Sequence, residues 1–200
     1  MSILVLAPEV ALFDGADASQ LGQSDPNIAR ARSYLTTVIP REIVGAVSSR
    51  GFLVHTREDD NGQKSLREAL LTESSIKGAP IKVIVPVTEQ YVLAYRMAVV
   101  QRQQVETERA VIGALSCLSL LALQFWSVST HEEIMNLDIV MMDVRLSRIA
   151  WRRHYSENLS QLKFLDNQYF GFAPFTRDRL SHFPTALKLQ TAVVPSSEGK

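Results

Sequence analysis

The stretch TEQYVLAYRMAVVQRQQVETERAVIGALSCLSLLALQFWSVSTHEE, residues 88–133, decides which fold the sequence predicts. It contains no proline, and its only glycine is Gly113. Thr88 followed by Glu89 is typical of a helix start. The stretch therefore predicts a long helix that begins near residue 88.

The segment that follows, residues 131–168, predicts a second long helix. Its apolar residues recur at the alternating three-and-four spacing of a helix that packs against another helix. The Ser127–Thr130 region is the expected bend, so the two helices would form an antiparallel helical hairpin over 88–168. The packing stripe of this hairpin would consist of Ile134, Leu137, Met141, Val144 and Trp151.

The N-terminal residues 1–87 have a different character and predict a small α/β unit. Expected strands are 2–7 (SILVLA), 52–56 (FLVHT) and 81–87 (IKVIVPV). Asp25-Pro26 predicts a helix over about 26–38, and Pro40 would begin a second short helix that ends before Gly51. A further helix is expected over 65–78, and the order of these elements favours an α/β arrangement.

Residues 169–200 are aromatic and irregular, with YFGFAPF at 169–175. We expect a loop-rich segment that lays its phenylalanines onto the body, with one short strand near 188–194 and a loosely held end. The predicted fold class is α+β, in three parts: 1–87, 88–168 and 169–200.

Composition excludes several classes of protein. The chain of 200 residues is 46% hydrophobic and 21% charged, which is typical of a folded globular protein. The 21 basic and 21 acidic residues balance, so no global attraction to nucleic acid or anionic lipid follows. A single cysteine, Cys117, excludes an intrachain disulfide framework and favours a reducing compartment.

The uncharged run from Ala110 to Thr130 has two interpretations. It is long enough to cross a bilayer as a helix, and its flanking charges would place the N-terminus in the cytoplasm. Five serine or glutamine residues and one glycine weaken that interpretation, and a helix buried among neighbours would be equally apolar. Burial is favoured, and a single-pass membrane protein is the alternative to a cytoplasmic one.

Basic residues gather between 145 and 154. Arg145, Arg148 and Arg152 would share one face of a helix, with Arg153 and His154 beside them. Phosphate contact with base stacking on Trp151 is conceivable. Because no nucleic-acid-binding motif surrounds the cluster, a solvated face is the favoured interpretation.

No catalytic constellation is recognisable in the sequence. The histidines lack zinc-binding spacing, Cys117 lies in an apolar run, and neither a nucleophile elbow nor a phosphate-binding loop occurs. The residues that could form an unrecognised acidic site are Asp14, Asp17 and His55. The sequence predicts no metal and no cofactor, and it identifies no small-molecule substrate.

The stretch REDDNGQKSLRE, residues 57–68, resembles a calcium-binding loop by spacing alone. Arg57 occupies the first position, where an acidic oxygen is required. Ser65 and Glu68 have the spacing of a capping box, which explains both without a metal. The stretch predicts a turn followed by a helix whose N-cap is Ser65.

These observations predict a non-enzymatic structural or assembly subunit that self-associates or joins partner proteins through helix–helix packing. The grounds are the absence of a catalytic constellation and a helix stripe too large for an 87-residue unit to cover. One alternative is a small α/β enzyme with the acidic site at Asp14, Asp17 and His55. The other is a membrane-anchored component with one spanning helix near 110–130.

Overall fold

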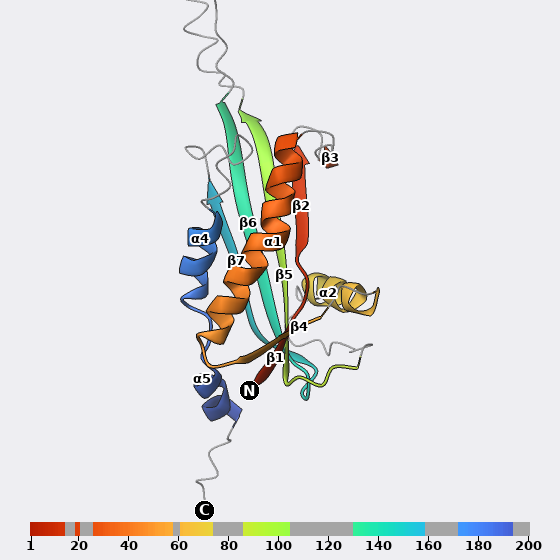
Figure 1. Cartoon of the computed structure of the whole chain (residues 1–200), viewed down its shortest axis with the longest axis vertical. Helices are drawn as coiled ribbons and strands as arrows, with labels where there is room; N and C mark the ends of the chain where they lie inside the picture. Colours follow the sequence, from red (N-terminus) through yellow and green to blue (C-terminus); the bar gives the residue numbers. More distant parts are fainter. Residues whose placement is uncertain are drawn as a thin grey trace, which may run out of the picture.

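The computed structural model describes residues 1–14, 19–20, 26–57, 61–73, 86–104, 130–158 and 172–193. Its strands are β1 (Ser2–Val5), β2 (Glu9–Asp14), β3 (Ser19–Gln20), β4 (Leu53–Thr56), β5 (Tyr91–Gln104), β6 (Thr130–Asp143) and β7 (Arg148–Asn158). Its helices are α1 (Pro26–Ser48), α2 (Asn61–Glu73), α4 (Phe172–Leu180) and α5 (Ala186–Val193). The chain is α+β, and one mixed sheet dominates it (Figure 1).

The predicted helical hairpin over 88–168 is wrong, because this region supplies the three longest strands described, β5, β6 and β7. Residues Tyr91 to Tyr95 are all buried, so the start of β5 is apolar on both faces and shows no period of two. Short apolar runs of this kind do not distinguish a buried strand from a buried helix. In β6 the alternation is visible, since Met135, Leu137 and Ile139 are buried while the residues between them are half-buried.

Strand β5 is the centre of the sheet. Along one edge it pairs with β6 over its whole length, antiparallel, from Tyr91 opposite Asp143 to Gln104 opposite Thr130. Along the other edge it pairs in parallel with β1 and then with β2, which lie end to end. Strand β4 pairs with β1, β3 pairs with β2, and β7 pairs with β6. Strands from both sides of residue 87 therefore belong to one sheet.

The junction of β1 and β2 contains a bulge. Val5 lies opposite Leu93, and Glu9 lies opposite Arg96. Three residues, Leu6 to Pro8, therefore connect β1 to β2 opposite only two residues of β5, Ala94 and Tyr95. The extra residue interrupts the ladder, and Pro8 is tolerated there because it has no N–H to donate. The bulge separates β1 from β2 and bends the edge of the sheet.

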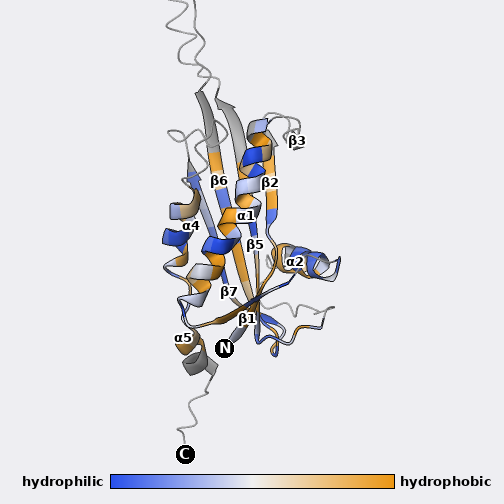
Figure 2. Ribbon diagram, viewed as in Figure 1, coloured by the Kyte–Doolittle hydropathy of each residue, from blue (hydrophilic) through white to orange (hydrophobic). Residues whose placement is uncertain are grey.

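Helices cover both faces of the sheet. Helix α1 crosses one face diagonally with α4 beside it, and α2 lies against the other face (Figure 1). The larger hydrophobic core lies under α1 and α4, and a smaller one lies under α2. Figure 2 shows the corresponding hydrophobic residues along β2, β5 and β6.

The sequence predicted that one helix ends before Pro40 and another begins there. This prediction is wrong, because α1 runs through Pro40 without a break. Its buried residues continue at helical spacing on both sides of the proline: Ile28, Ala31, Leu35, Ile39, Ile43 and Val47. A proline inside a helix costs about 3 kcal/mol. Burial of one continuous apolar face against the sheet offsets that cost.

Two further expectations need correction. Helix α2 begins at Asn61, so Ser65 is not its N-cap; the Ser65 hydroxyl instead donates to the Asn61 carbonyl at 3.0 Å. The C-terminal segment contains α4 and α5, and Ala186–Val193 is helical where a strand was expected. Phe172, Phe175 and Phe183 are buried, as predicted.

Several expectations fall outside the described residues. These are the strand over 81–85, Asp17, Cys117 and the apolar run from 110 to 129. Over the seven ranges that the structure describes, no helix has both the length and the hydrophobicity to cross a membrane.

Candidate functional site

A cleft of about 600 Å³ lies between α1 and the bulge that joins β1 to β2. Val5, Leu6, Ala7 and Pro8 form its sheet side, and Thr56 and Arg57 at the end of β4 close one end. In open α/β sheets, ligands usually bind in the crevice just outside the carboxyl ends of the parallel strands. The bulge places the cleft at such ends of β1 and β4.

The wall formed by α1 contains the two residues that most disfavour a helix interior. Both Pro40 and Gly45 line the cleft. A Cβ atom added at Gly45 would have no heavy atom within 4 Å, so packing does not require a glycine here. Glycine inside a helix costs about 0.5–1 kcal/mol relative to alanine. The helix is thus locally weakened on the side that borders the cleft.

The lining also includes a buried phenol. Tyr95 on β5 is 0% exposed, and its hydroxyl has no hydrogen-bond partner among the described residues. Burial raises the pKa of Tyr95 well above its usual value, while the Arg67 guanidinium acts in the opposite direction. The phenol is therefore neutral at physiological pH and can donate one hydrogen bond.

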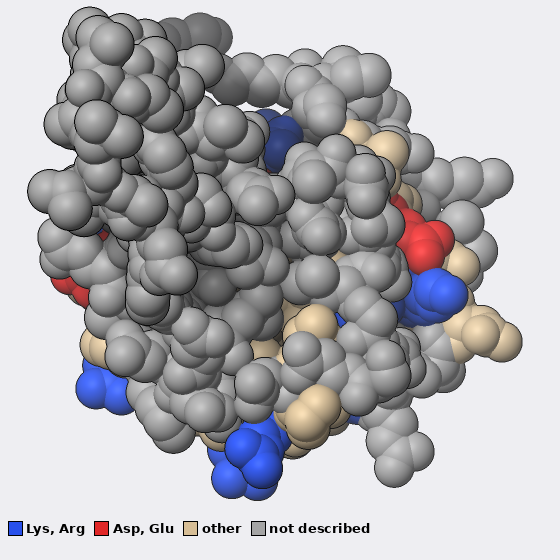
Figure 3. Space-filling view, turned by 90° about the horizontal axis from the view of Figure 1, so that it is seen from above, with Lys and Arg blue, Asp and Glu red and all other residues tan. Residues whose placement is uncertain are grey.

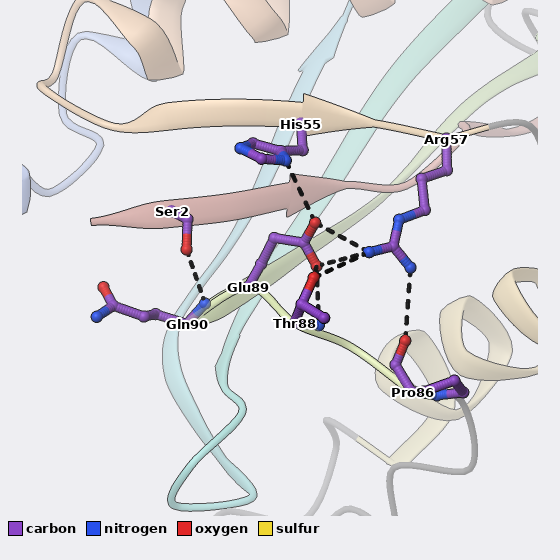
Figure 4. Close-up of polar contacts among 7 residues, drawn as sticks. All are labelled: Ser2, His55, Arg57, Pro86, Thr88, Glu89 and Gln90. Atoms are coloured by element: carbon purple, nitrogen blue, oxygen red, sulfur yellow. Dashed lines mark hydrogen bonds and ion pairs between the residues drawn. The ribbon is translucent and has the colours of Figure 1, made fainter.

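Two arginines are among the lining residues, Arg41 on α1 and Arg57 after β4. Figure 4 shows how Arg57 is held. Its Nη2 donates to both carboxylate oxygens of Glu89, at 3.0 and 3.1 Å, and to Thr88 Oγ1 at 3.2 Å. Its Nη1 donates to the Pro86 carbonyl at 3.4 Å. Arg57 is therefore fixed in place by the segment that enters β5.

Glu89 is the centre of this polar cluster, with its side chain only 3% exposed. His55 Nδ1 lies 3.4 Å from Glu89 Oε1. Burial by itself would raise the pKa of Glu89, but backbone and side-chain hydrogen bonds and the Arg57 charge outweigh it, and the pKa is lowered. Glu89 is therefore ionised at neutral pH, and it balances one of the two arginines.

The polar residues of the described lining are two arginines, Tyr95 and three threonines, Thr36, Thr37 and Thr56. Arginine stays protonated, Tyr95 stays neutral, and the Thr36 and Thr37 hydroxyls donate within α1. Among the residues that the structure describes, no three His, Cys, Asp or Glu side chains come close enough to hold a metal ion. This arrangement suits binding through apolar contact and charge.

The predicted acidic site is not assembled. Asp14 lies beside Gln101 at one end of the sheet, whereas His55 lies in line with Val92 near the other. The strand from Val92 to Gln101 spans roughly 30 Å at about 3.3 Å per residue. Asp14 and His55 therefore belong to different parts of the molecule.

The predicted basic face is divided by the strand. Arg152 lies opposite Val140 and Arg153 opposite Ile139, so these neighbours point to opposite faces of β7. Arg145 lies in the turn before β7, with its Nε 4.0 Å from Asp143 Oδ1, and Arg148 is the first residue of β7. From one end of the molecule, described charges of both signs are scattered around the margin (Figure 3). Phosphate contact by these arginines stays a prediction.

Four residues of the predicted packing stripe lie on strands, and Val144 lies in the turn between β6 and β7. Leu137 and Met141 are fully buried in the larger core with Trp151 packed against it, while Val144 packs against the smaller core. Ile134 is half-buried on β6. These residues therefore do not form one face of a helix.

The sequence analysis did not predict the residues of the cleft, because no motif or spacing in the sequence connects them. Glu89 was interpreted as the first turn of a helix, and Arg57 as a spoiled calcium ligand. The one available signal was Gly45, a glycine within a helical pattern, since such a glycine usually has a packing or functional reason.

The chain matches no known family model and no curated protein sequence. It is similar to a solved structure described as a neuraminyllactose-binding hemagglutinin homolog from Helicobacter pylori, at 8% identity and a TM-score of 0.44, covering 95% of this chain and 88% of that one. The hypothetical protein CT253 from Chlamydia trachomatis has 11% identity and a TM-score of 0.39, with 96% and 90% covered. Lipoprotein GNA1162 from Neisseria meningitidis has 11% identity and a TM-score of 0.37, with 90% and 94% covered. These TM-scores are too low to support a conclusion about function.

Proposed function

We propose that this chain is a non-enzymatic binding domain that takes a small molecule into the cleft between α1 and the β1–β2 bulge. The observation that carries the proposal is the α1 wall, where Pro40 and Gly45 weaken the helix at the cleft and a Cβ atom at Gly45 would meet no heavy atom within 4 Å. Positions at which a residue disfavours its own secondary structure are often functional sites. The volume of about 600 Å³ is within the usual range for small-molecule sites.

The partner-free hydroxyl of Tyr95 supports the same proposal. A buried polar group without a partner costs about 1–3 kcal/mol, and native structures contain few of them. The hydroxyl is closed to solvent in the unliganded chain, so a ligand would accept its hydrogen bond only after side chains of the lining move. The cleft thus combines an apolar lining with a few polar groups, as small-molecule sites usually do.

Filling the cleft from Gly45 tests the proposal. Anilinonaphthalene sulfonate, a fluorescent probe with an apolar body and an anionic group, should bind the wild type saturably. Gly45→Leu should weaken this binding about ten-fold or more, because the added side chain occupies the cleft. Gly45→Ala is the matched control, since it adds helix propensity with one carbon and should retain binding.

Circular dichroism and melting temperature establish that both variants fold. Equal probe affinity in the wild type and Gly45→Leu, with both folded, would show that the probe binds elsewhere and would refute the proposal.

A second candidate function is that of an assembly subunit, in which the contact surface contains Leu53 and Leu187 and not the predicted helix stripe. Leu53 at the start of β4 and Leu187 on α5 are 65% and 70% exposed. They lie at the same end of the molecule, because the Ala186 N–H donates to the Arg50 carbonyl there at 3.0 Å. Exposed apolar side chains that cluster often mark a protein interface. Light scattering should then give a mass above 22.3 kDa that Leu53→Asp with Leu187→Asp lowers; a monomeric wild type would exclude self-association.

A further inference from the structure

We propose that the ligand of this cleft is a monoanionic amphiphile, an acid with one negative head group on an apolar body, whose head contacts Arg41. The inference rests on the proposed function, because it assigns the chemistry of a ligand in the same cleft. Three observations carry it: the sign of the charges that line the cleft, their balance, and the apolar character of the remaining lining.

Arg41 and Arg57 are the two charged residues of the described lining, which includes no Asp, Glu or Lys. Arg41 is exposed and has no ion pair with any other described residue. Arg57 donates from Nη1 and Nη2 to Pro86, Thr88 and Glu89, none of which lines the cleft, so Arg41 is the arginine left for a ligand. Guanidinium groups bind carboxylate and phosphate oxygens through several parallel N–H donors. An anionic head group is therefore the complementary partner.

The local charge balance favours a single negative charge on the ligand. Glu89 is buried and ionised against Arg57, so it cancels one of the two guanidinium charges. One positive charge, that of Arg41, is then left for the cleft. A monoanion such as a carboxylate neutralises it, whereas a dianion would leave an excess negative charge in the cleft.

The rest of the lining suits an alkyl or ring body. Val5, Leu6, Pro8 and Val44 are apolar, and the hydroxyls of Thr36 and Thr37 donate to carbonyls within α1. Apolar surface removed from water contributes about 25 cal/mol per Å². A short acid without such a body would lose this term, so amphiphiles should bind better than acetate.

Calorimetric titration with three probes that share one chain tests the inference: octanoate, octan-1-ol and octylammonium. Octanoate should bind about ten-fold more tightly than octan-1-ol, and octylammonium should bind least. Arg41→Gln should lower the affinity for octanoate about ten-fold and leave octan-1-ol unchanged. Arg30→Gln is the matched control, since Arg30 is an exposed arginine of the same helix that does not line the cleft.

Two different failures are distinguishable. If octan-1-ol binds as tightly as octanoate, or if Arg41→Gln leaves the affinity for octanoate unchanged, the assignment of an anionic head group is wrong. The proposed function still holds in that case if Gly45→Leu abolishes binding of all the probes. If none of the three probes binds the folded wild type, and Gly45→Leu does not affect the fluorescent probe, the proposed function fails as well.

Discussion

At the residue scale, the phenol of Tyr95 is the most unusual group in the cleft. It is fully buried, it carries no charge, and its hydroxyl has no described partner. Tyr155 is a useful contrast, because its hydroxyl donates to the Arg179 carbonyl at 3.2 Å. The two tyrosines therefore predict opposite responses to loss of the hydroxyl group.

Tyr95→Phe should leave the free energy of unfolding unchanged or raise it by about 1 kcal/mol, because it removes an unpaired polar group from the interior. Tyr155→Phe should lower the free energy of unfolding by about 0.5–1.5 kcal/mol, because it removes a hydrogen bond. Equilibrium denaturation of the ligand-free protein measures both. A loss in Tyr95→Phe as large as in Tyr155→Phe would mean that the Tyr95 hydroxyl is bonded in solution.

Glu89 gives a prediction with a defined pH dependence. Glu89→Gln should lower the free energy of unfolding at pH 7 by about 1–3 kcal/mol, since it removes charged hydrogen bonds to Arg57. The folded-state pKa of Glu89 is lowered from its ordinary value of 4.5. The stabilisation is therefore fully present above pH 4.5 and is lost as the pH falls through the lower folded-state pKa.

The matched control is Glu9→Gln, because Glu9 pairs with Arg96 in a position where both side chains are about one-third exposed (34% and 33%). That pair should contribute about 0–1 kcal/mol. If the deficit of Glu89→Gln at pH 7 is no larger than that of Glu9→Gln, Glu89 does not hold Arg57 in solution.

At the element scale, α2 shows how a correct motif can be placed wrongly. Ser65 and Glu68 have capping-box spacing, but the helix begins four residues earlier, at Asn61. Ser65 lies exposed within the helix, and its hydroxyl bonds back to the preceding turn. Such bonds do not stabilise a helix as an N-cap does.

Ser65→Ala should therefore leave the free energy of unfolding unchanged or raise it by up to about 0.5 kcal/mol, because alanine has the higher helix propensity. An N-cap at Ser65 would instead cost about 0.5–2 kcal/mol on the same substitution. Thermal and chemical denaturation separate these outcomes, and a loss of 1 kcal/mol or more would restore the capping box.

At the scale of the whole molecule, one sheet joins residues that are far apart in the sequence. Leu137 on β6 is fully buried in the core that also contains Ile3 and Leu35. Leu137→Ala should lower the free energy of unfolding by about 2–5 kcal/mol. Unfolding should stay a single transition, because the core includes elements from both halves of the chain.

Leu146→Ala is the control, since Leu146 is 46% exposed, and it should change the free energy of unfolding by less than about 0.5 kcal/mol. Calorimetry that resolves two separate transitions, only one of them shifted by Leu137→Ala, would contradict a shared core.

The sequence by itself determined the α+β class, the strands at 2–5 and 53–56, the start of α1 at Pro26 and the burial of the C-terminal phenylalanines. Each of these depends on local signals such as proline, β-branched runs and aromatic spacing. The tertiary structure alone decided that 91–104 is a strand, because the start of β5 is buried on both faces and has no helical or strand period. Strands β6 and β7 are then built onto it by antiparallel pairing. The tertiary structure also decided the cleft, since residues 5–8, 36–45, 56–57 and 95 meet only through sheet register and one bulge. Register depends on pairing between distant segments, and no local pattern in this chain specifies it.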